Sequence, residues 1–167
     1  MTGATTCGLR LFARLLLGGA LLAPLLATAA ASCSITATGP AFGLYNPLNA
    51  SPTLANGSVA ATCTWTGGGA TTVNLVSSYS PGNSGSYPNR YMLSGTNRLN
   101  YNLYYDAAFT QIRGDGTGGT QTGGASLSVS SGARTASTTS VIYGRIPAAQ
   151  SPNPGTYSDT ILVTINY

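Results

Sequence analysis

The most constraining feature of this sequence is a period-two alternation over its last stretch, residues 156–167. Apolar residues occupy alternate positions and polar residues mostly fill the positions between them, with Leu162 as the exception. The apolar set is Ile161, Val163, Ile165 and Tyr167. This alternation, rich in β-branched residues, predicts a half-buried β-strand. The sequence ends with this strand, and an open apolar edge promotes aggregation, so we expect another element to cover it.

The rest of the chain predicts short strands separated by turns rich in Gly, Pro and Asn. Strands are expected at residues 33–38, 58–65, 71–77, 90–93, 98–105, 109–113, 126–130 and 140–146. Loops are expected at residues 48–57, closed by an Asn56-Gly57 turn, and at residues 67–69, 79–88 and 114–124. No helical periodicity of useful length follows residue 31. Many short strands at even spacing predict an all-β sandwich.

The first 31 residues predict a secretory signal peptide. Arg10 and Arg14 precede an apolar run at residues 15–26, and small residues follow through Ala31. This order of a basic start, an apolar middle and a small-residue end is typical of a cleaved signal. We therefore expect one mature domain, residues 32–167, exported through the periplasm and free of the membrane after cleavage.

The alternatives to a cleaved signal are a retained membrane anchor and a lipoprotein signal. A retained membrane anchor is disfavoured because the apolar run is short and contains Pro24. A lipoprotein signal would attach lipid to Cys33, which follows the small residues. Such signals usually carry Leu three positions before the cysteine, and Ala30 stands there.

Cys33 and Cys63 are the only thiols left once Cys7 is removed with the signal. Two thiols in an exported domain predict one disulfide, and two buried free thiols are the alternative. Closure of the 30-position loop would stabilise the fold by about 3–4 kcal/mol in the chain-entropy model. The alternation of residues 58–65 sends Cys63 inward beside Trp65, where Cys33 can meet it.

The charged residues are few and of two types only. All seven basic residues are Arg and all three acidic residues are Asp, and Lys, Glu and His are absent. The lack of His excludes His-based hydrolytic triads, and the lack of Lys excludes lysine nucleophiles. The five Arg residues of the mature chain are scattered, which argues against a nucleic-acid interface.

The three carboxylates do not form a recognisable catalytic or metal site. Asp106 and Asp159 stand at predicted strand ends, where a turn or hydrogen-bonding role is expected. Asp115 lies between two glycines but lacks the neighbouring carboxylates of a calcium loop. We therefore expect neither an enzyme nor a cofactor or metal site.

A series of short motifs runs in order from Cys33 to Tyr167: Cys33, Phe42-Gly43-x-Tyr45, Cys63, Arg90-Tyr91-Met92, Leu99-x-Tyr101-x-Leu103-Tyr104-x-Asp106, Gly114-Asp115-Gly116, Tyr143-Gly144-Arg145-Ile146-Pro147 with Gln150, and Gly155-x-Tyr157-x-Asp159-Thr160. Together these motifs resemble the spore coat protein U domain family, which is related to Csu-type archaic chaperone–usher pilins.

The resemblance implies a structural or adhesive subunit of a cell-surface fibre used in biofilm formation. It implies an incomplete immunoglobulin-like β-sandwich that lacks its final strand. In such pilins a periplasmic pilus chaperone lends a strand, and after passage through the outer-membrane usher a neighbouring pilin subunit supplies it. Ile161, Val163, Ile165 and Tyr167 would then line the donor-strand groove. The alternative is a secreted spore or cell coat protein that does not polymerise.

Two further expectations concern the position of the chain in a fibre. The predicted cleavage leaves only a stub before Cys33, too short to span a groove at about 3.3 Å per residue. This predicts a subunit that accepts a strand without donating one, as at a fibre tip. The turn-rich loop at residues 79–88 is the predicted adhesive surface, through Tyr79, Pro81, Tyr87 and Pro88; an ordinary loop with exposed Tyr is the alternative.

Overall fold

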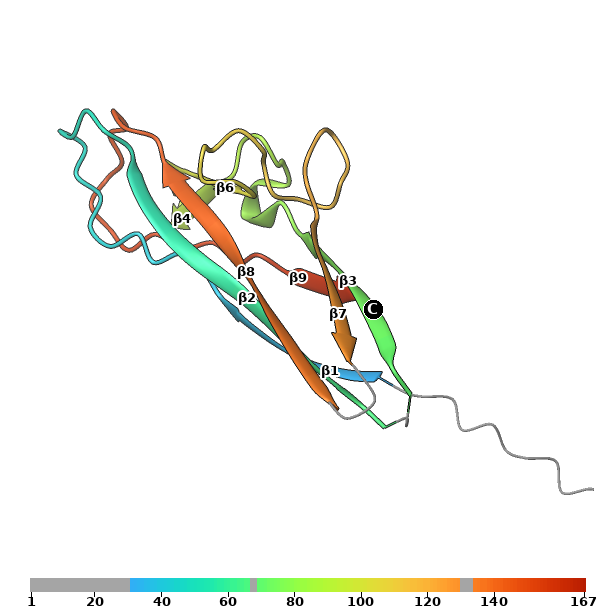
Figure 1. The fold of residues 1–167 in the computed structure, drawn as a ribbon. Coiled ribbons are helices and arrows are strands. Elements are labelled where there is room, and N and C mark those ends of the chain that lie inside the picture. Colours follow the sequence, from blue (N-terminus) through green and yellow to red (C-terminus); the bar gives the residue numbers. More distant parts are fainter. Residues whose placement is uncertain (1–30, 67–68, 130–133) are drawn as a thin grey trace, which may run out of the picture.

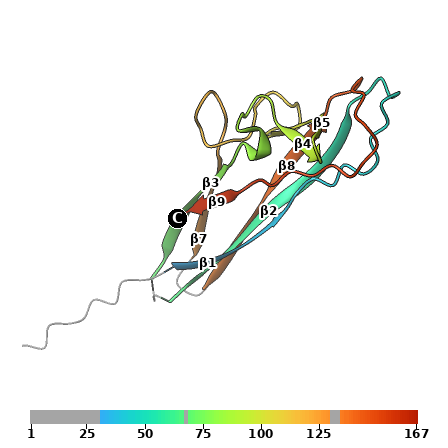
Figure 2. The same ribbon diagram turned by 180° about the vertical axis from the view of Figure 1, so that it is seen from behind.

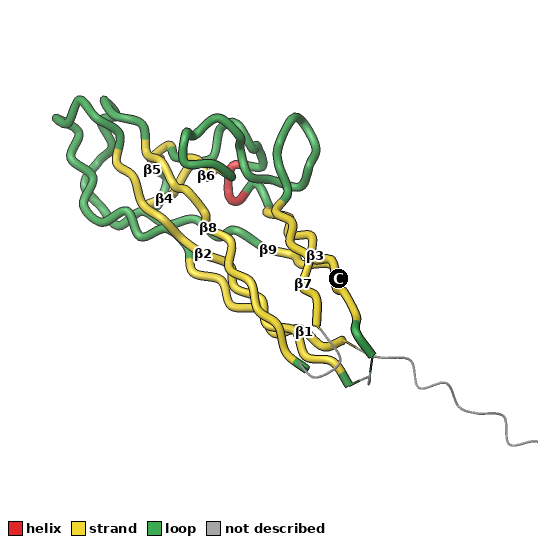
Figure 3. The backbone as a smooth tube through the Cα atoms, in the orientation of Figure 1, coloured by secondary structure: helices red, strands yellow, loops and turns green. Residues whose placement is uncertain are grey.

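A computed structural model describes residues 31–66, 69–129 and 134–167, and it is built almost wholly of β-strands and loops (Figures 1 and 3). The predicted signal peptide, apart from Ala31, lies outside the described residues, as do Gly67, Gly68 and Ser130. The elements are β1 (Ala31–Thr38), β2 (Thr53–Trp65), β3 (Thr71–Tyr79), the short 3₁₀ turn η1 (Gly82–Ser84), β4 (Tyr91–Ser94), β5 (Asn97–Asn100), β6 (Asn102–Tyr104), β7 (Gly123–Val129), β8 (Thr135–Ile146) and β9 (Val163–Asn166).

The strands form two packed sheets and one small hairpin. One sheet has the order β1-β2-β8-β6 and the other has the order β7-β3-β9, while β4 and β5 pair with each other. Every strand pairing between named elements is antiparallel. The predicted all-β sandwich is confirmed.

The long strands β2 and β8 form the spine of the larger sheet (Figure 1). The inward face of β2 carries Val59, Ala61, Cys63 and Trp65, all buried, as the alternation predicted. On β8, Ile142, Gly144 and Ile146 are buried. Alternation along a half-buried strand is therefore the pattern that places the core.

Side chains from both sheets meet in two hydrophobic clusters. One lies at the end of the molecule that carries β4, β5 and β6, and it includes Tyr79, Leu99, Leu103 and Ile146. The other surrounds Cys63 and Trp65 and takes Leu75 and Leu127 from the smaller sheet. Ile165 of β9 packs against both clusters.

The predicted Asn56-Gly57 turn is wrong, because both residues lie inside β2. Gly57 pairs with Ile142 of β8 in the middle of the sheet. A Cβ atom on Gly57 would collide with the backbone oxygen of Thr38. Gly57 therefore lets the chain that leaves β1 cross close to β2, and the glycine marks a close approach rather than a turn.

The predicted strand at residues 109–113 is also wrong. This segment is a loop with isolated bridges, Tyr104 to Ile112 and Arg113 to Gln121. The Asp106 carboxylate accepts hydrogen bonds from the backbone N–H groups of Thr110 and Gln111 and holds a tight turn instead. The predicted strand at residues 98–105 is split at Tyr101 into β5 and β6.

Two arginines are buried, Arg90 and Arg113. Arg113 donates to the Tyr79 hydroxyl and to the Val141 carbonyl, and Arg90 donates to the Asn102 side chain and to the Ser80 carbonyl. Burial lowers the pKa of the Arg90 guanidinium below its ordinary value. These side chains tie loops to the sandwich, a role that the alternation patterns did not predict.

Candidate functional site

Two strand edges are left without a pairing partner on the same side of the sandwich. Within the described residues, β1 pairs only with β2, and β9 pairs only with β3. Figures 1 and 2 show β1 and β9 alongside these neighbours, each at the border of its own sheet. The apolar C-terminal strand predicted from the sequence is therefore an edge strand, although its regular part is limited to Val163–Asn166.

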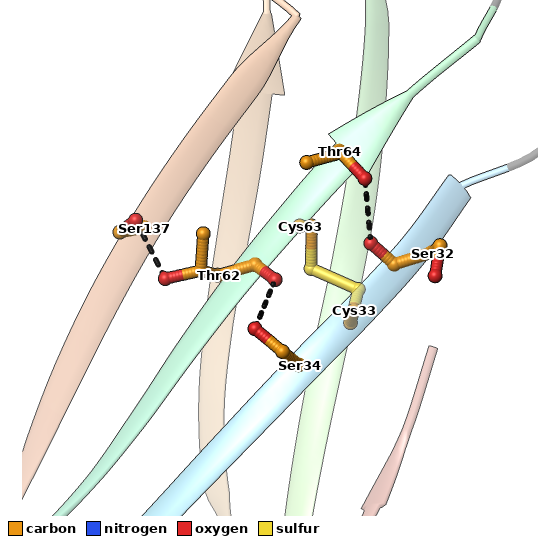
Figure 4. The surroundings of a disulfide bond; sticks show 7 residues. All are labelled: Ser32, Cys33, Ser34, Thr62, Cys63, Thr64 and Ser137. Carbon is orange, nitrogen blue, oxygen red and sulfur yellow. Dashed lines mark hydrogen bonds between the residues drawn. A yellow bond between two sulfur atoms is a disulfide. The ribbon is translucent and has the colours of Figure 1, made fainter.

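The outward-facing backbone groups of β1 can be assigned from the disulfide. Cys33 lies directly opposite Cys63, with an S–S bond of 2.05 Å and Cα atoms 4.0 Å apart (Figure 4). This short spacing is typical of a non-hydrogen-bonded antiparallel pair, in which N–H and C=O point away from the partner strand. By alternation, Cys33, Ile35 and Ala37 direct their backbone groups toward the open edge. The predicted disulfide is confirmed.

The same alternation assigns the open edge of β9. The Ser80 N–H donates to the Leu162 carbonyl, so the even-numbered residues face β3. Ile161, Val163 and Ile165 therefore direct their N–H and C=O groups to the other side. Two rows of unpaired backbone donors and acceptors thus border the space between β1 and β9.

The apolar side chains of these two edges are incompletely covered. Ile35 is 42% exposed, and Ile161, Val163 and Ile165 are half-buried. On the neighbouring strands β2 and β3 most inward residues are buried, for example Leu75 at 5% exposure, although Val73 is half-buried. The inward side chains of the two unpaired edges are therefore less covered than most of those on the strands beside them.

A groove of about 470 Å³ lies between the edges. We call it the edge groove. Its rims are residues 37–42 and residues 157–163, and its floor is Tyr79, Met92, Tyr101, Leu103 and Ile142. The floor residues are buried and, apart from the tyrosine hydroxyls, apolar. The groove is therefore a length of core that the described residues leave uncovered.

Phe42 can pack into the groove because the residue of β8 that it lies against, Gly144, has no side chain. A Cβ atom on Gly144 would come within 2.7 Å of Phe42 Cζ and 2.9 Å of Pro40 Cβ. The Phe42 ring contacts the Tyr101 ring edge-on, with centroids 6.0 Å apart. Tyr157, on the opposite rim, packs against the same core cluster. Their motifs, Phe42-Gly43 and Gly155-x-Tyr157, are the signals that could have placed these two residues in the site.

Asp159 fixes the rim at the start of the C-terminal strand. Its carboxylate accepts hydrogen bonds from the Asn83 N–H at 2.9 Å and from the Tyr101 hydroxyl at 2.7 Å. Gly82 makes this contact possible, since a Cβ atom there would collide with the carboxylate. Burial and the hydrogen bond to Asp159 raise the pKa of Tyr101 above its ordinary value, so the hydroxyl remains a donor. Sequence reasoning gave Asp159 a turn or hydrogen-bonding role but not a place in the groove.

The predicted groove residues are distributed unequally. Ile161 and Val163 line the edge groove, whereas Ile165 lies deeper, between the two sheets. Tyr167 does not line the groove and is 58% exposed. The role of this set in accepting a strand remains a prediction.

One residue of the predicted adhesive loop is misplaced. Tyr79 ends β3 and is 1% exposed, with its hydroxyl accepting a hydrogen bond from Arg113. Because the ring is buried in the core, it is not available to an external surface. Pro88 is exposed and Pro81 and Tyr87 are half-buried, so the adhesive role stays a prediction for these three residues.

The family model of the Spore Coat Protein U domain matches residues 20–164. The chain belongs to the Spore Coat Protein U domain family. The match includes both groove edges and the two disulfide cysteines. It confirms the resemblance drawn from the sequence motifs. A comparison with curated proteins found no match.

Among solved structures, this family member is similar to a chain in the crystal structure of the CsuC–CsuE chaperone–tip adhesion subunit pre-assembly complex from archaic chaperone–usher Csu pili of Acinetobacter baumannii. The TM-score is 0.48 and the sequence identity is 18%. The similarity covers 83% of this chain and 40% of that chain. This chain therefore spans less than half the length of the solved chain.

The described residues contain neither a metal-ligand cluster nor a membrane-spanning helix. No group of three or more His, Cys, Asp or Glu residues among them is placed to hold a metal ion. In the same part of the chain, no helix is long and apolar enough to cross a membrane.

Proposed function

We propose that this chain is a structural or adhesive subunit of a cell-surface fibre, and that its edge groove accepts a strand from another polypeptide. The donors would be a periplasmic pilus chaperone and then a neighbouring pilin subunit, with assembly through an outer-membrane usher. Membership in the Spore Coat Protein U domain family supports this class of function. The predicted export of residues 32–167 to the cell surface belongs to the same proposal.

The observation that carries the proposal is the pair of unpaired edges over an apolar floor. Strand addition joins an extended peptide to a sheet edge through backbone hydrogen bonds, while alternate side chains enter pockets. The edge groove offers both requirements: free backbone groups on β1 and β9, and apolar side chains between them.

The expected stabilisation is large because the donor completes a core. Four aliphatic side chains along the two unpaired edges are partly exposed: Ile35, Ile161, Val163 and Ile165. Full burial of one such side chain stabilises by about 1.5–3 kcal/mol, and roughly half of that remains to be gained at each position. The sum is about 3–6 kcal/mol, before any contribution from the donor's own side chains.

A fused donor strand tests the proposal. A hairpin linker after Tyr167 would return a strand of alternating Val and Thr along β9, antiparallel to it, in the position between β9 and β1. The mature chain with this extension should be monomeric and melt cooperatively at a higher temperature than the unextended chain. The control carries Ser in place of each Val of the donor and should remain prone to aggregation.

The alternative function makes the opposite prediction. A secreted coat component with a closed fold would be a stable monomer without any donor. If the unextended chain melts cooperatively at the same temperature as the fusion, the donor-strand role is wrong.

The adhesive part of the proposal rests on the loop at residues 79–88. We propose that Tyr87 and Pro88 contact the surface to which a fibre attaches. Cells that display the fibre with Tyr87→Ser should adhere less than cells with wild-type subunits. A control substitution, Tyr167→Ser, lies outside the loop, and equal adhesion of all three strains would remove this role.

A further inference from the structure

A second space lies next to the edge groove, beyond the residues along which a strand could pair. This space, of about 610 Å³, lies between residues 40–47 and residues 152–157, and we call it the proline pocket. In both ribbon views these two segments run side by side at the end of the molecule away from the disulfide (Figures 1 and 2). The two spaces share Pro40, Phe42, Met92 and Tyr157 in their linings, so they lie directly next to each other.

The walls of the proline pocket differ from the rims of the edge groove. Four prolines line it: Pro40, Pro47, Pro152 and Pro154. Neither wall belongs to a β-strand. Because proline has no backbone N–H, these walls offer few donors to an inserted strand. An occupant here must be held by side-chain burial and not by ladder hydrogen bonds.

The floor and sides of the pocket are apolar. Met92, Leu99 and Ile146 form the floor and are themselves buried. Tyr45 and Tyr157 present ring surface, because their hydroxyls donate to the carbonyls of Pro147 and Asn153. Leu44 is 93% exposed at the rim. Pockets of a few hundred Å³ with apolar and aromatic walls are typical of sites that bury a ligand side chain or a small molecule.

Hydrogen bonds hold both walls in place before any occupant arrives. The Gln150 side chain bridges the N–H and C=O of Asn100, at 2.8 and 2.9 Å, and its backbone N–H donates to the Tyr45 hydroxyl at 2.9 Å. Gly155 approaches so closely that a Cβ atom would collide with the Ser94 hydroxyl. The pocket is therefore preformed, and filling it costs little ordering.

We propose that the donor segment has two parts: a strand that pairs along β1 and β9, and a following bulky apolar side chain that enters the proline pocket without backbone pairing. This inference rests on the proposed donor-strand function. The two spaces are adjacent and share four lining residues, which is the reason to assign both to one polypeptide. A donor that runs antiparallel to β9 from the disulfide end reaches the pocket after it passes Ile161.

The fused-donor protein allows a direct test. Its donor strand is extended at the C-terminal end by a short Ser-rich segment, and Phe is placed at each of three successive positions in three separate variants. An all-Ser extension is the matched control. One Phe position should raise the folding equilibrium constant by about tenfold or more over the control, the factor given by burial of one aromatic side chain.

A blocking substitution shows whether the gain arises in this pocket. Thr156 is exposed and lines the proline pocket but not the edge groove. Thr156→Trp should therefore fill the pocket and abolish the stability advantage of Phe over Ser. The fused donor with the all-Ser extension should retain its own stabilisation in this variant. Ala41→Trp, on the opposite wall, provides a second blocking variant if Thr156→Trp does not fold.

The outcomes separate the two proposals. If no Phe position exceeds the Ser control, or if the gain survives both Trp substitutions, the proline pocket is not a donor subsite, while the edge groove stands. If the fused donor with the all-Ser extension gives no stabilisation over the unextended chain, the edge groove itself fails and this inference fails with it.

Discussion

The sandwich has two borders where its sheets meet without hydrogen-bonded pairing, and they differ sharply in how well they close. On one border β7 packs against β8, and the space between the sheets there is about 140 Å³. On the other border β1 faces β9 across the edge groove of about 470 Å³. At the first border Leu127 and Val129 are buried and only small residues such as Ala125 and Thr138 are half-buried, whereas at the second border the large side chains are half-buried or exposed.

Residue size accounts for the difference. The β7–β8 border is lined by Gly123, Gly124 and Ala125 on one side and by Thr138 and Ser140 on the other, so the two sheets can approach. A Cβ atom on Gly123 would already collide with the Ser77 hydroxyl. The β1–β9 border instead carries larger aliphatic side chains, and Pro40 prevents β1 from continuing. One border is closed by small residues, whereas the other is left open as the edge groove.

Loss of the disulfide should have the largest effect on the open border. Cys33→Ser with Cys63→Ser removes the covalent link between β1 and β2, the only strand with which β1 pairs in the described residues. We expect the free energy of unfolding to fall by about 3–4 kcal/mol. Denaturant unfolding of the fused-donor protein measures this loss, and an unchanged midpoint would contradict the role of the disulfide in holding the groove edge.

A matched pair of cavity substitutions compares the borders directly. Leu75→Ala on β3 should cost about 2–3 kcal/mol, at the low end for buried Leu because small neighbours allow the site to relax. Ile161→Ala on the groove rim should cost less than about 1.5 kcal/mol in the chain without a donor, since its side chain is already half-exposed.

The donor should remove most of the difference between these two substitutions. In the fused-donor protein Ile161 becomes buried, so the cost of Ile161→Ala should approach that of Leu75→Ala. Denaturant unfolding of both variants, with and without the donor, gives the four values needed. An Ile161→Ala cost that does not rise with the donor would show that the donor lies elsewhere.

The Asp159 hydrogen bonds should have a smaller effect, concentrated at the groove rim. Asp159→Ala leaves the buried Tyr101 hydroxyl without its acceptor and should cost about 1–3 kcal/mol. Asp159→Asn should cost less, because the tyrosine hydroxyl can rotate and accept from the new amide. Asp115→Ala, in an exposed loop, is the control, and equal costs at both positions would argue against a special role for Asp159.

The smallest effect should come from protonation of Asp106 at low pH, which should loosen its own loop and leave both sheet borders unchanged. Despite some desolvation, hydrogen bonds from Gln111 and Thr110 hold the pKa of the Asp106 carboxyl below its ordinary value of about 4. A depressed pKa means that this contribution is present above the ordinary value and is lost as the pH falls through the folded-state value. The protection factors of the Thr110 and Gln111 amides, measured against the intrinsic exchange rate at each pH, should therefore fall in acid, while those in the β7–β8 region do not.

The sequence was sufficient to predict the strand faces but not the strand borders. Alternation correctly placed Val59, Cys63 and Trp65 on one inward face, because period two maps directly onto the two faces of a strand. The start of β2 was predicted at Ser58, whereas the strand begins at Thr53. The error arose because Asn-Gly is a frequent turn signal, while the real reason for Gly57 is a tertiary contact. Nothing local in the sequence reveals that the chain leaving β1 passes there.

The candidate site was predictable on one side only. The apolar alternation identified Ile161 and Val163, and the thiol count identified the disulfide. The opposite rim, residues 37–42 with Phe42, was not identified, since which edges face each other depends on the order of strands in two sheets. The burial of Tyr79 was missed for a related reason: its partner Arg113 lies 34 positions away in the chain.

The most direct test of an open strand position is amide hydrogen exchange at the two edges. The N–H groups of Ile35, Ala37, Val163 and Ile165 should exchange rapidly in the chain without a donor and become protected in the fused-donor protein. Amides of the sheet interior, such as Val59 of β2, should be protected in both. Slow exchange at both groove edges in the unextended monomer would contradict the account, because it would mean that the chain already pairs these edges itself.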